Sequence, residues 1–465
     1  MSGYKEIATR ESCFRPGSTL CPGCMEAIAF QNVGRVSDNG VKTVFTIGTS
    51  CAEVSSLFFP NVVAWGRGDA PPDDFTKSFS ILHNVVESAP TLAAAVSDVA
   101  DVLTEQGALQ HPVQVISSSG DGGALAIGLR ALLHTIHRRA RVTLMVLVNE
   151  IFANTGFQYS PATTPFADTS TTPNGPGHPG NVQPPLDYIH LCIAAGAGMV
   201  AQISPAHGKM FVKTWERALE AEGTAVIFVP APCISGWKFE DGETVRLATL
   251  GAQTGVFPVF VWEKGKGGSV KDCSLTESER PAVEEFLGIQ RRFHHMVQKD
   301  PATGRFAPRP GREEDVAKLK GWVQSNVERL YKLAELKSPD PLRTPGRVRE
   351  GAARKRFHRN YRWAPVLFRA LERSHGRPHA AFVEETPSTP ALTALAWRLL
   401  RRFEPQPDRP TGEFHAFPCF TDSIRPGSLG ARERPEAHPC GRPPQRPHDP
   451  DRGDRHDGRA RDHVH

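Results

Sequence analysis

One stretch of the sequence, residues 113–156, limits the possible fold more than any other. Residues 113–116 have the composition of a β-strand, and three serines and the tripeptide Gly120-Asp121-Gly122 follow them. Apolar residues recur at helical spacing over 123–139, and the nearly continuous apolar run 142–148 predicts a second strand, buried on both faces. Such strand–helix–strand units are right-handed and their two strands are parallel. We therefore expect an α/β fold with a doubly wound, mostly parallel sheet.

Two polar residues, Asp121 and Asn149, follow the two strands of this unit and lie 28 positions apart. Because parallel strands end at the same edge of a sheet, we expect these side chains to face one another across a crevice. A carboxylate, an amide oxygen and nearby backbone carbonyls form an oxygen shell that suits Mg²⁺ carrying a diphosphate. Gly120 and Gly122 would let the backbone approach phosphate oxygens closely.

The tripeptide alone is a common turn, but its surroundings narrow the interpretation. With Asn149 it resembles the thiamine diphosphate motif, and residues 149–158, with Ser160 and 162–165, resemble the 2-oxoacid:ferredoxin oxidoreductases. Within them the resemblance is to the β subunits of the pyruvate:ferredoxin enzymes. Residues 254–260 and 281–287, then Gln290, Arg292, Phe293 and His295, extend the resemblance, which covers about residues 13–336.

The cysteines allow several interpretations on their own. Cys21 and Cys24 form a Cys-x-x-Cys pair, which is found in zinc sites, redox disulfides and iron–sulfur sites. Cys51 and Cys233 follow expected strands at 42–47 and 224–229, where buried structural thiols are the plain alternative. Cys13, Cys192 and Cys273 have no such company, and we assign them no role.

The family resemblance implies a complete set of site residues. It implies that Cys21, Cys24, Cys51 and Cys233 hold a 4Fe-4S cluster, and that Asp121, Asn149 and the carbonyl of Ile151 hold Mg²⁺. It also implies cofactor contacts from Glu26, Ser50, Gly120, Gly122, Asn154 and Thr155, with Asn154 on the catalytic side. Met25 stands where the family has a small glycine in its Cys-x-x-Cys-Gly-Glu pattern.

The activity implied is the oxidative decarboxylation of pyruvate with coenzyme A to acetyl-CoA, CO₂ and reduced ferredoxin. A relative acting on branched-chain or aryl 2-oxoacids is the alternative within the enzyme class. A zinc-stapled α/β binding protein without redox chemistry is the alternative outside it. Residues 1–336 leave no room for a pyrimidine-binding domain, so we expect a separate α subunit to supply it. No ferredoxin-type run of cysteines occurs, so further clusters would lie on other chains.

Charge divides the chain into unequal parts. Residues 337–465 hold 25 Lys+Arg against 16 Asp+Glu, which leaves 30 against 34 for residues 1–336. The basic character therefore belongs to the C-terminal part, and a nucleic-acid role for the whole chain loses its main support. Neither a signal-peptide core nor a run of 18 apolar residues occurs, so we expect a soluble cytoplasmic protein without membrane contact.

We expect three segments. Residues 1–260 would bind thiamine diphosphate and the iron–sulfur cluster, 261–336 would form a helical extension with a final helix at 314–336, and 337–465 would be a largely disordered tail. Arg, Pro, His and Asp supply 24 of the last 35 residues, which leaves little to bury. We interpret this tail as an extension without catalytic function, read outside the ancestral frame, and RNA binding is the alternative. A helix broken or kinked at Pro90 is expected over residues 78–106.

Overall fold

The fold of the chain comes from a computed structural model, which describes residues 19–57, 79–109 and 112–337, together with Lys5, residues 7–10, Ser12 and Phe14. Cys13 and residues 338–465 lie outside the described residues, and with them the predicted disordered or RNA-binding tail.

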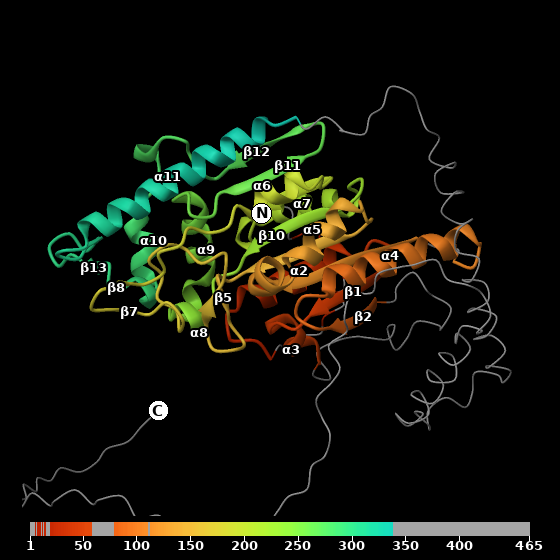
Figure 1. The fold of residues 1–465 in the computed structure, drawn as a ribbon, viewed down its shortest axis with the longest axis horizontal. Coiled ribbons are helices and arrows are strands. Elements are labelled where there is room, and N and C mark those ends of the chain that lie inside the picture. Colours follow the sequence, from red (N-terminus) through yellow and green to blue (C-terminus); the bar gives the residue numbers. More distant parts are fainter. Residues whose placement is uncertain are drawn as a thin grey trace, which may run out of the picture. The chain divides into compact units, whose positions relative to one another are not determined.

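An eight-stranded sheet forms the centre of the described chain (Figure 1). Its strand order is β12-β11-β9-β10-β4-β3-β1-β2. The six strands from β9 to β2 pair in parallel, and β11 pairs antiparallel with both β9 and β12. The prediction of a doubly wound, mostly parallel α/β sheet is thus confirmed. The strands are β1 (Lys42–Gly48), β2 (Phe79–Asn84), β3 (Val113–Gly120), β4 (Thr143–Val148), β9 (Met199–Gln202), β10 (Ala225–Pro230), β11 (Val259–Glu263) and β12 (Gly267–Lys271).

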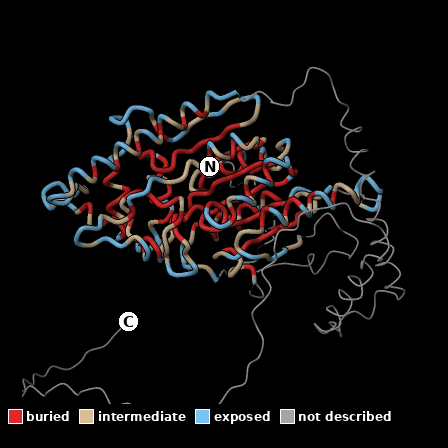
Figure 2. Tube along the Cα trace, in the orientation of Figure 1, coloured by how far each residue is buried: buried red, intermediate tan, exposed pale blue. Residues whose placement is uncertain are grey.

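Helices cover both faces of this sheet. Alternate side chains of β4 illustrate the two layers, because Val146 and Val148 belong to one apolar cluster and Met145 and Leu147 to another. The principal helices are α2 (Met25–Val36), α3 (Cys51–Leu57), α4 (Ala89–Glu105), α5 (Leu129–His137), α6 (Tyr188–Ala194), α7 (Lys209–Leu219), α8 (Ile234–Trp237), α9 (Thr244–Gln253), α10 (Val283–Ile289) and α11 (Glu313–Glu335). The central strands are accordingly the most buried part of the trace (Figure 2).

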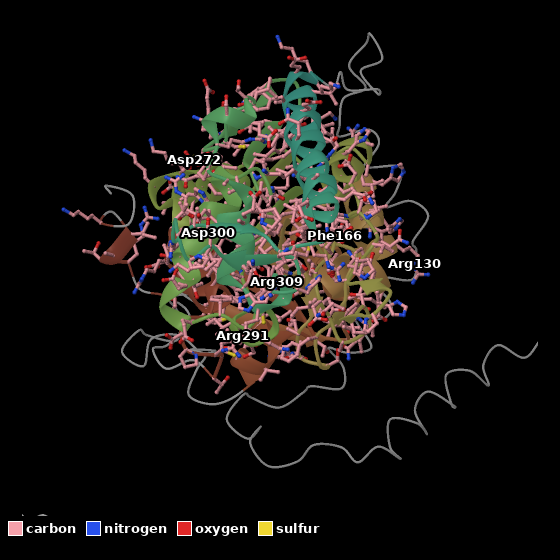
Figure 3. All side chains as sticks on the ribbon, turned by 90° about the vertical axis from the view of Figure 1, so that its left-hand side faces the viewer. Arg130, Phe166, Asp272, Arg291, Asp300 and Arg309 are labelled. Carbon is pink, nitrogen blue, oxygen red and sulfur yellow. The ribbon has the colours of Figure 1, made fainter. Side chains whose placement is uncertain are left out.

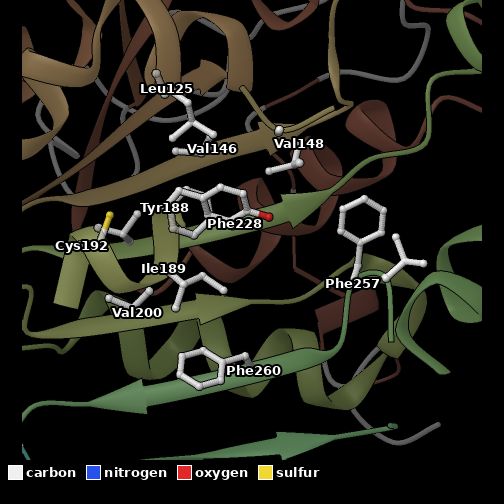
Figure 4. Packing of buried hydrophobic residues seen from close by; sticks show 14 of the residues in the cluster. Leu125, Val146, Val148, Tyr188, Ile189, Cys192, Val200, Phe228, Phe257 and Phe260 are labelled. Carbon is white, nitrogen blue, oxygen red and sulfur yellow. The ribbon is translucent and has the colours of Figure 1, made fainter. Parts of the chain in front are cut away.

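The first apolar cluster joins β4 and β10 to α4, α5, α6, α10 and α11. Figure 4 shows its middle, where the ring of Tyr188 packs on that of Phe228 with centroids 4.4 Å apart, beside Val146 and Val148. The second cluster places α2 and α7 on the opposite face. This sandwich leaves the carboxyl edge of the parallel strands to the connecting loops, which is where sites form in such sheets.

Two local predictions needed correction. The expected helix over 78–106 is wrong in its first part, because Phe79–Asn84 forms the edge strand β2, and α4 starts only at Ala89. Pro90 neither breaks nor kinks α4, since it occupies the first turn, where its missing N–H has no partner to lose. The helix expected at 123–139 begins as a π-helix (Gly122–Ile127) and continues as α5.

Residues 259–337 extend the same core. β11 and β12 continue the sheet, and apolar side chains of α10 and α11 belong to the cluster that contains Val146. The predicted final helix is confirmed as α11. Short hairpins complete the described chain: β5 (Ile151–Phe152) with β6 (Gln158–Tyr159), β7 (Asn174–Gly175) with β8 (His178–Pro179), and β13 (Val297–Lys299) with β14 (Phe306–Pro308). Within the described ranges, no helix is long and apolar enough to span a bilayer.

Candidate active site

The predicted site residues come together at the carboxyl edge of four neighbouring parallel strands. The strands β1, β3, β4 and β10 end next to one another, as the pairings of Ile47 with Ser118, Gly120 with Leu147, and Pro230 with Val148 show. Four predicted site residues follow these ends within three positions: Cys51, Asp121, Asn149 and Cys233. Segments far apart in the sequence therefore meet here because the parallel order brings their strand ends to one edge.

Asp121 follows the last residue of β3 at this edge and is fully buried. The hydroxyl of Ser160 donates to its Oδ2 at 2.5 Å, whereas its Oδ1 has no hydrogen-bond partner among the described residues. Burial raises the pKa of the Asp121 carboxyl to about 8, and the charge of Glu150 raises it further while the bond from Ser160 opposes the shift. A buried carboxylate oxygen without a partner is costly, unless a cation binds it.

Asn149 and Glu26 are paired across the site. The side-chain amide of Asn149 donates to Glu26 Oε1 at 2.9 Å, and its Oδ1 accepts from the backbone N–H of Ile151 at 3.1 Å. Glu26 Oε2 has no partner within the part of the chain that the structure describes. Burial raises the pKa of Glu26 to about 7, against the opposing effect of the Asn149 hydrogen bond.

The glycines of the motif have different surroundings. A Cβ on Gly122 would lie 2.6 Å from the ring of Phe152, so this glycine is required by side-chain packing. A Cβ on Gly120 would meet only the Cβ of Ser50, at 3.9 Å, so the backbone here is approachable. Gly120 and Ser50 therefore lie next to each other at the ends of β3 and β1, where the strand order reverses.

Four thiols gather at the same edge. Cys51 Sγ donates to Asn154 Oδ1 at 3.2 Å, and Cys233 Sγ accepts from the N–H of Gly236 at 3.4 Å. Burial is the largest cause of the raised thiol pKa values of Cys24 and Cys51, and the charge of Glu26 is the next. The pKa of Cys24 is raised to about 12. Cys21 Sγ lies 3.3 Å from Ser235 Oγ, two residues after Cys233, and the charges of Cys233, Cys24 and Cys21 also raise the pKa of Cys51.

The Cys21–Cys24 turn and the predicted substrate side are the more accessible parts of the site. Gly23 has φ +71°, and a Cβ there would lie 2.6 Å from the carbonyl oxygen of Asp241. Cys21, Asn154 and Thr155 are exposed. Asn154 is thus an exposed residue whose side chain accepts a hydrogen bond from Cys51. Among the described residues, no group of three or more His, Cys, Asp or Glu is arranged to hold a single metal ion.

Three residues beside the site had no role in the sequence-based assignment. Glu150 and Arg292 form a fully buried ion pair, and the Arg292 guanidinium lies 3.6 Å from the ring centroid of Trp237. Trp237 Nε1 donates to the carbonyl of Asn149 at 2.8 Å. The sequence holds one signal for this pair. Glu150 is a charged residue that stands between two predicted ligands, after an apolar strand.

Much of the chain is similar to known proteins. Residues 82–229 match the model of the C-terminal TPP-binding domain of thiamine pyrophosphate enzymes. Pyruvate synthase subunit PorB of Methanothermobacter thermautotrophicus is 30% identical over 63% of this chain and 93% of its own length. The chain belongs to the β-subunit family of the 2-oxoacid:ferredoxin oxidoreductases. The family match supports thiamine diphosphate as the cofactor.

Other members of this family are similar to nearly the same extent. Pyruvate synthase subunit PorB of Thermotoga maritima is 29% identical over 73% of this chain and 97% of its own length. Ketoisovalerate oxidoreductase subunit VorB of Pyrococcus furiosus is 29% identical over 70% of this chain and 94% of its own length. Overall identity therefore assigns the chain to the β-subunit family and to oxidoreductase complexes, and it leaves the two substrates named by these relatives unseparated.

Proposed function

We propose that this chain is the cofactor-binding β subunit of a pyruvate:ferredoxin oxidoreductase, which converts pyruvate and coenzyme A to acetyl-CoA and CO₂ and reduces ferredoxin. One observation carries the proposal: the buried Asp121 carboxyl, one oxygen of which has no partner among the described residues, lies at the same sheet edge as Cys51 and Cys233. A buried carboxylate without a counter-charge is costly, and a bound cation would supply one.

The residues present fit Mg²⁺ with a diphosphate. Asp121, Asn149 and the carbonyl of Ile151 would hold the metal, whose charge would keep the buried Asp121 carboxylate ionised. Ser160 holds one oxygen of Asp121 and leaves the other available. Glu26 fixes the orientation of the Asn149 amide. When bound, thiamine diphosphate supplies a carbon nucleophile for the 2-oxo group of the substrate.

We assign the thiols to a 4Fe-4S cluster. In such a cluster each of four thiolates binds a different iron, so Cys21, Cys24, Cys51 and Cys233 need not converge on one point. The contact of Cys21 Sγ with Ser235 Oγ at 3.3 Å brings the Cys21–Cys24 turn beside the Cys233 turn, which supports this assignment. When bound, the cluster accepts electrons one at a time, which zinc cannot do. Asn154 accepts a hydrogen bond from Cys51 and would lie on the side that faces the substrate.

The proposal requires partners. The relatives are named as enzyme subunits, which supports an α subunit with the pyrimidine-binding domain, further cluster-bearing chains and ferredoxin as the partners that would complete the cytoplasmic enzyme. A ketoisovalerate or other 2-oxoacid enzyme is the second candidate, because VorB relatives match as well as PorB relatives do.

Metal analysis of the anaerobically purified chain tests the proposal. Iron with acid-labile sulfide, at about four irons per chain, would support it. Zinc without sulfide would favour a zinc-stapled binding protein and would contradict the redox assignment. The assembled complex, assayed in parallel with pyruvate and with 2-ketoisovalerate, separates the two substrate assignments by the ratio of kcat/KM.

A further inference from the structure

We propose that Arg292 is a positioning residue that fixes the diphosphate side and the thiolate side of the site relative to each other. It would do so by holding the segment Asn149–Ile151 and the turn Cys233–Trp237 against each other. The inference rests on the proposed function, because it concerns the segments that would hold Mg²⁺ and the cluster.

Glu150 anchors the first segment. It lies between Asn149 and Ile151, its side chain is fully buried, and its backbone is in the left-handed region at φ +64°. A left-handed conformation is unfavourable for a residue with a long side chain, and it persists only where the surroundings impose it. The surroundings here are Thr163, which donates to the Glu150 carbonyl at 2.7 Å, and Thr164 and Arg292, which bind its carboxylate.

Arg292 connects this anchor to the second segment. Its side chain is 1% exposed, and its Nη1 pairs with Glu150 while its Nε donates to Gln290 Oε1 at 2.6 Å. The flat face of the guanidinium lies on the Trp237 ring at 3.6 Å. A planar cation can make an edge contact with a carboxylate and a face contact with an indole at once, which a lysine ammonium cannot.

Trp237 closes the connection from the other side. Its Nε1 donates to the carbonyl of Asn149, and its backbone N–H donates to the carbonyl of Cys233, both at 2.8 Å. One residue earlier, a Cβ on Gly236 would lie 2.1 Å from Ile151 Cδ1 and 3.3 Å from Cys233 Sγ. The cysteine turn therefore packs directly on the predicted magnesium segment. A displacement of either one is transmitted to the other through contacts that are already in place.

The test uses the assembled complex with the α subunit and three variants. Arg292→Met alone leaves Glu150 buried without its counter-charge, so its melting temperature should fall. Arg292→Met with Glu150→Gln replaces the pair by neutral groups, and the melting temperature should return close to that of the wild type. Arg291→Gln is the matched control, since Arg291 is the exposed neighbour (Figure 3).

Two properties other than turnover are measured: the affinity for thiamine diphosphate with Mg²⁺ by calorimetry, and the EPR signal and midpoint potential of the reduced cluster. In the double variant we expect the affinity to fall roughly 10- to 100-fold, the usual effect of removing a group that orients metal ligands. We expect the EPR signal or potential to shift in the same variant, and both properties to be unchanged in Arg291→Gln. A double variant with wild-type affinity and wild-type cluster properties would show that the pair only stabilises the fold. A change on one side alone would show that the two sides are not coupled.

Trp237→Phe keeps the test decisive should the double variant fail to recover its stability. It retains a ring below Arg292 and removes only the Nε1 donor to Asn149. We expect a smaller shift of both properties in the same directions, and a variant with neither shift would overturn the proposal. Failure of the proposed function is distinguishable, because the wild-type complex itself would then bind no thiamine diphosphate or contain no iron and sulfide.

Discussion

The side-chain amide of Asn149 donates a hydrogen bond of 2.9 Å to the carboxylate of Glu26, a residue 123 positions away in the sequence. Glu26 stands in the first turn of α2, directly after the Cys21–Cys24 turn, and Asn149 follows the last residue of β4. The bond therefore ties the start of the cysteine segment to the predicted diphosphate segment. It also leaves Glu26 Oε2 buried and without a partner among the described residues, which is equally true of Asp121 Oδ1.

Asp121→Ala should abolish magnesium-dependent binding of thiamine diphosphate in the assembled enzyme. The reason is that Asp121 is the only charged protein ligand in the proposed metal shell. Calorimetry with Mg²⁺ and thiamine diphosphate measures the effect, and the iron content should be unchanged because the cysteines are untouched. Binding at near wild-type affinity would remove Asp121 from the site.

Cys233→Ala should lose or degrade the cluster and leave diphosphate binding in place. Cys192→Ala is the control, because Cys192 is a buried thiol in the core on α6 and is none of the four proposed ligands. EPR spectra of the reduced proteins and their iron and sulfide contents are the measurements. We expect a normal signal for the control and none for Cys233→Ala, and a normal signal in both would show that Cys233 is no ligand.

Much of this edge was predictable from the sequence because it depends on local patterns. The apolar run before Asn149 and the strand pattern before Gly120 identify two parallel strands, and parallel strands necessarily end together. The same reasoning brings Cys51 and Cys233 to the edge once their strands are recognised. These predictions needed only the positions of strand ends and no side-chain contact.

The features that were missed depend on contacts between distant residues. Residues 79–84 were assigned to the helix because they precede the small-residue-rich segment that forms α4, and their pairing with β1 makes them a strand. The Glu150–Arg292 pair joins positions 142 residues apart, and Arg292 was recognised from the family pattern without a role. The packing of Phe152 on Gly122 is likewise invisible in the sequence, where that glycine suggests only phosphate contact.

Gly23→Ala should disturb the Cys21–Cys24 turn. A Cβ at Gly23 would lie 2.6 Å from a backbone oxygen, that of Asp241, in addition to the strain of a positive φ. Gly40→Ala is the control, since Gly40 also has a positive φ, +83°, but nothing lies within 4 Å of its Cβ position. We expect both variants to lose about 1–2 kcal/mol of stability from the left-handed backbone. Only Gly23→Ala should in addition lower the iron content, and equal iron in the two variants would contradict the proposed ligand turn.

The isolated chain should show no oxidation of 2-oxoacids, and activity should appear when the cognate α subunit is added. We expect this because the aminopyrimidine of the cofactor needs a carboxylate from a pyrimidine-binding domain, which we propose that the α subunit supplies. Ferredoxin or methyl viologen reduction under anaerobic conditions is the assay. Turnover by the isolated chain would show that the missing carboxylate is supplied within residues 1–465.

The stability of the magnesium-free and thiamine-free chain should fall as the pH rises from about 4 to 8. Burial raises the folded-state pKa of Asp121 to about 8 from an ordinary value of 3.8, and that of Glu26 to about 7 from 4.5. A raised folded-state pKa means that the fold favours the protonated carboxyl. This stabilisation is complete below the ordinary pKa and is lost as the pH rises through the folded-state value.

Asp121→Asn isolates this effect, because it keeps the size of the side chain and an oxygen that can accept from Ser160, and it does not titrate. The difference in unfolding free energy between the wild type and the variant should change by at most about 1.4 kcal/mol per pH unit within that window. Denaturant unfolding in EDTA at pH 5, 6, 7 and 8 measures it. Adding Mg²⁺ and thiamine diphosphate to the assembled enzyme should remove the wild-type loss, since a bound cation favours the ionised carboxylate. Parallel pH profiles for the two proteins would show that Asp121 is already ionised in the metal-free fold.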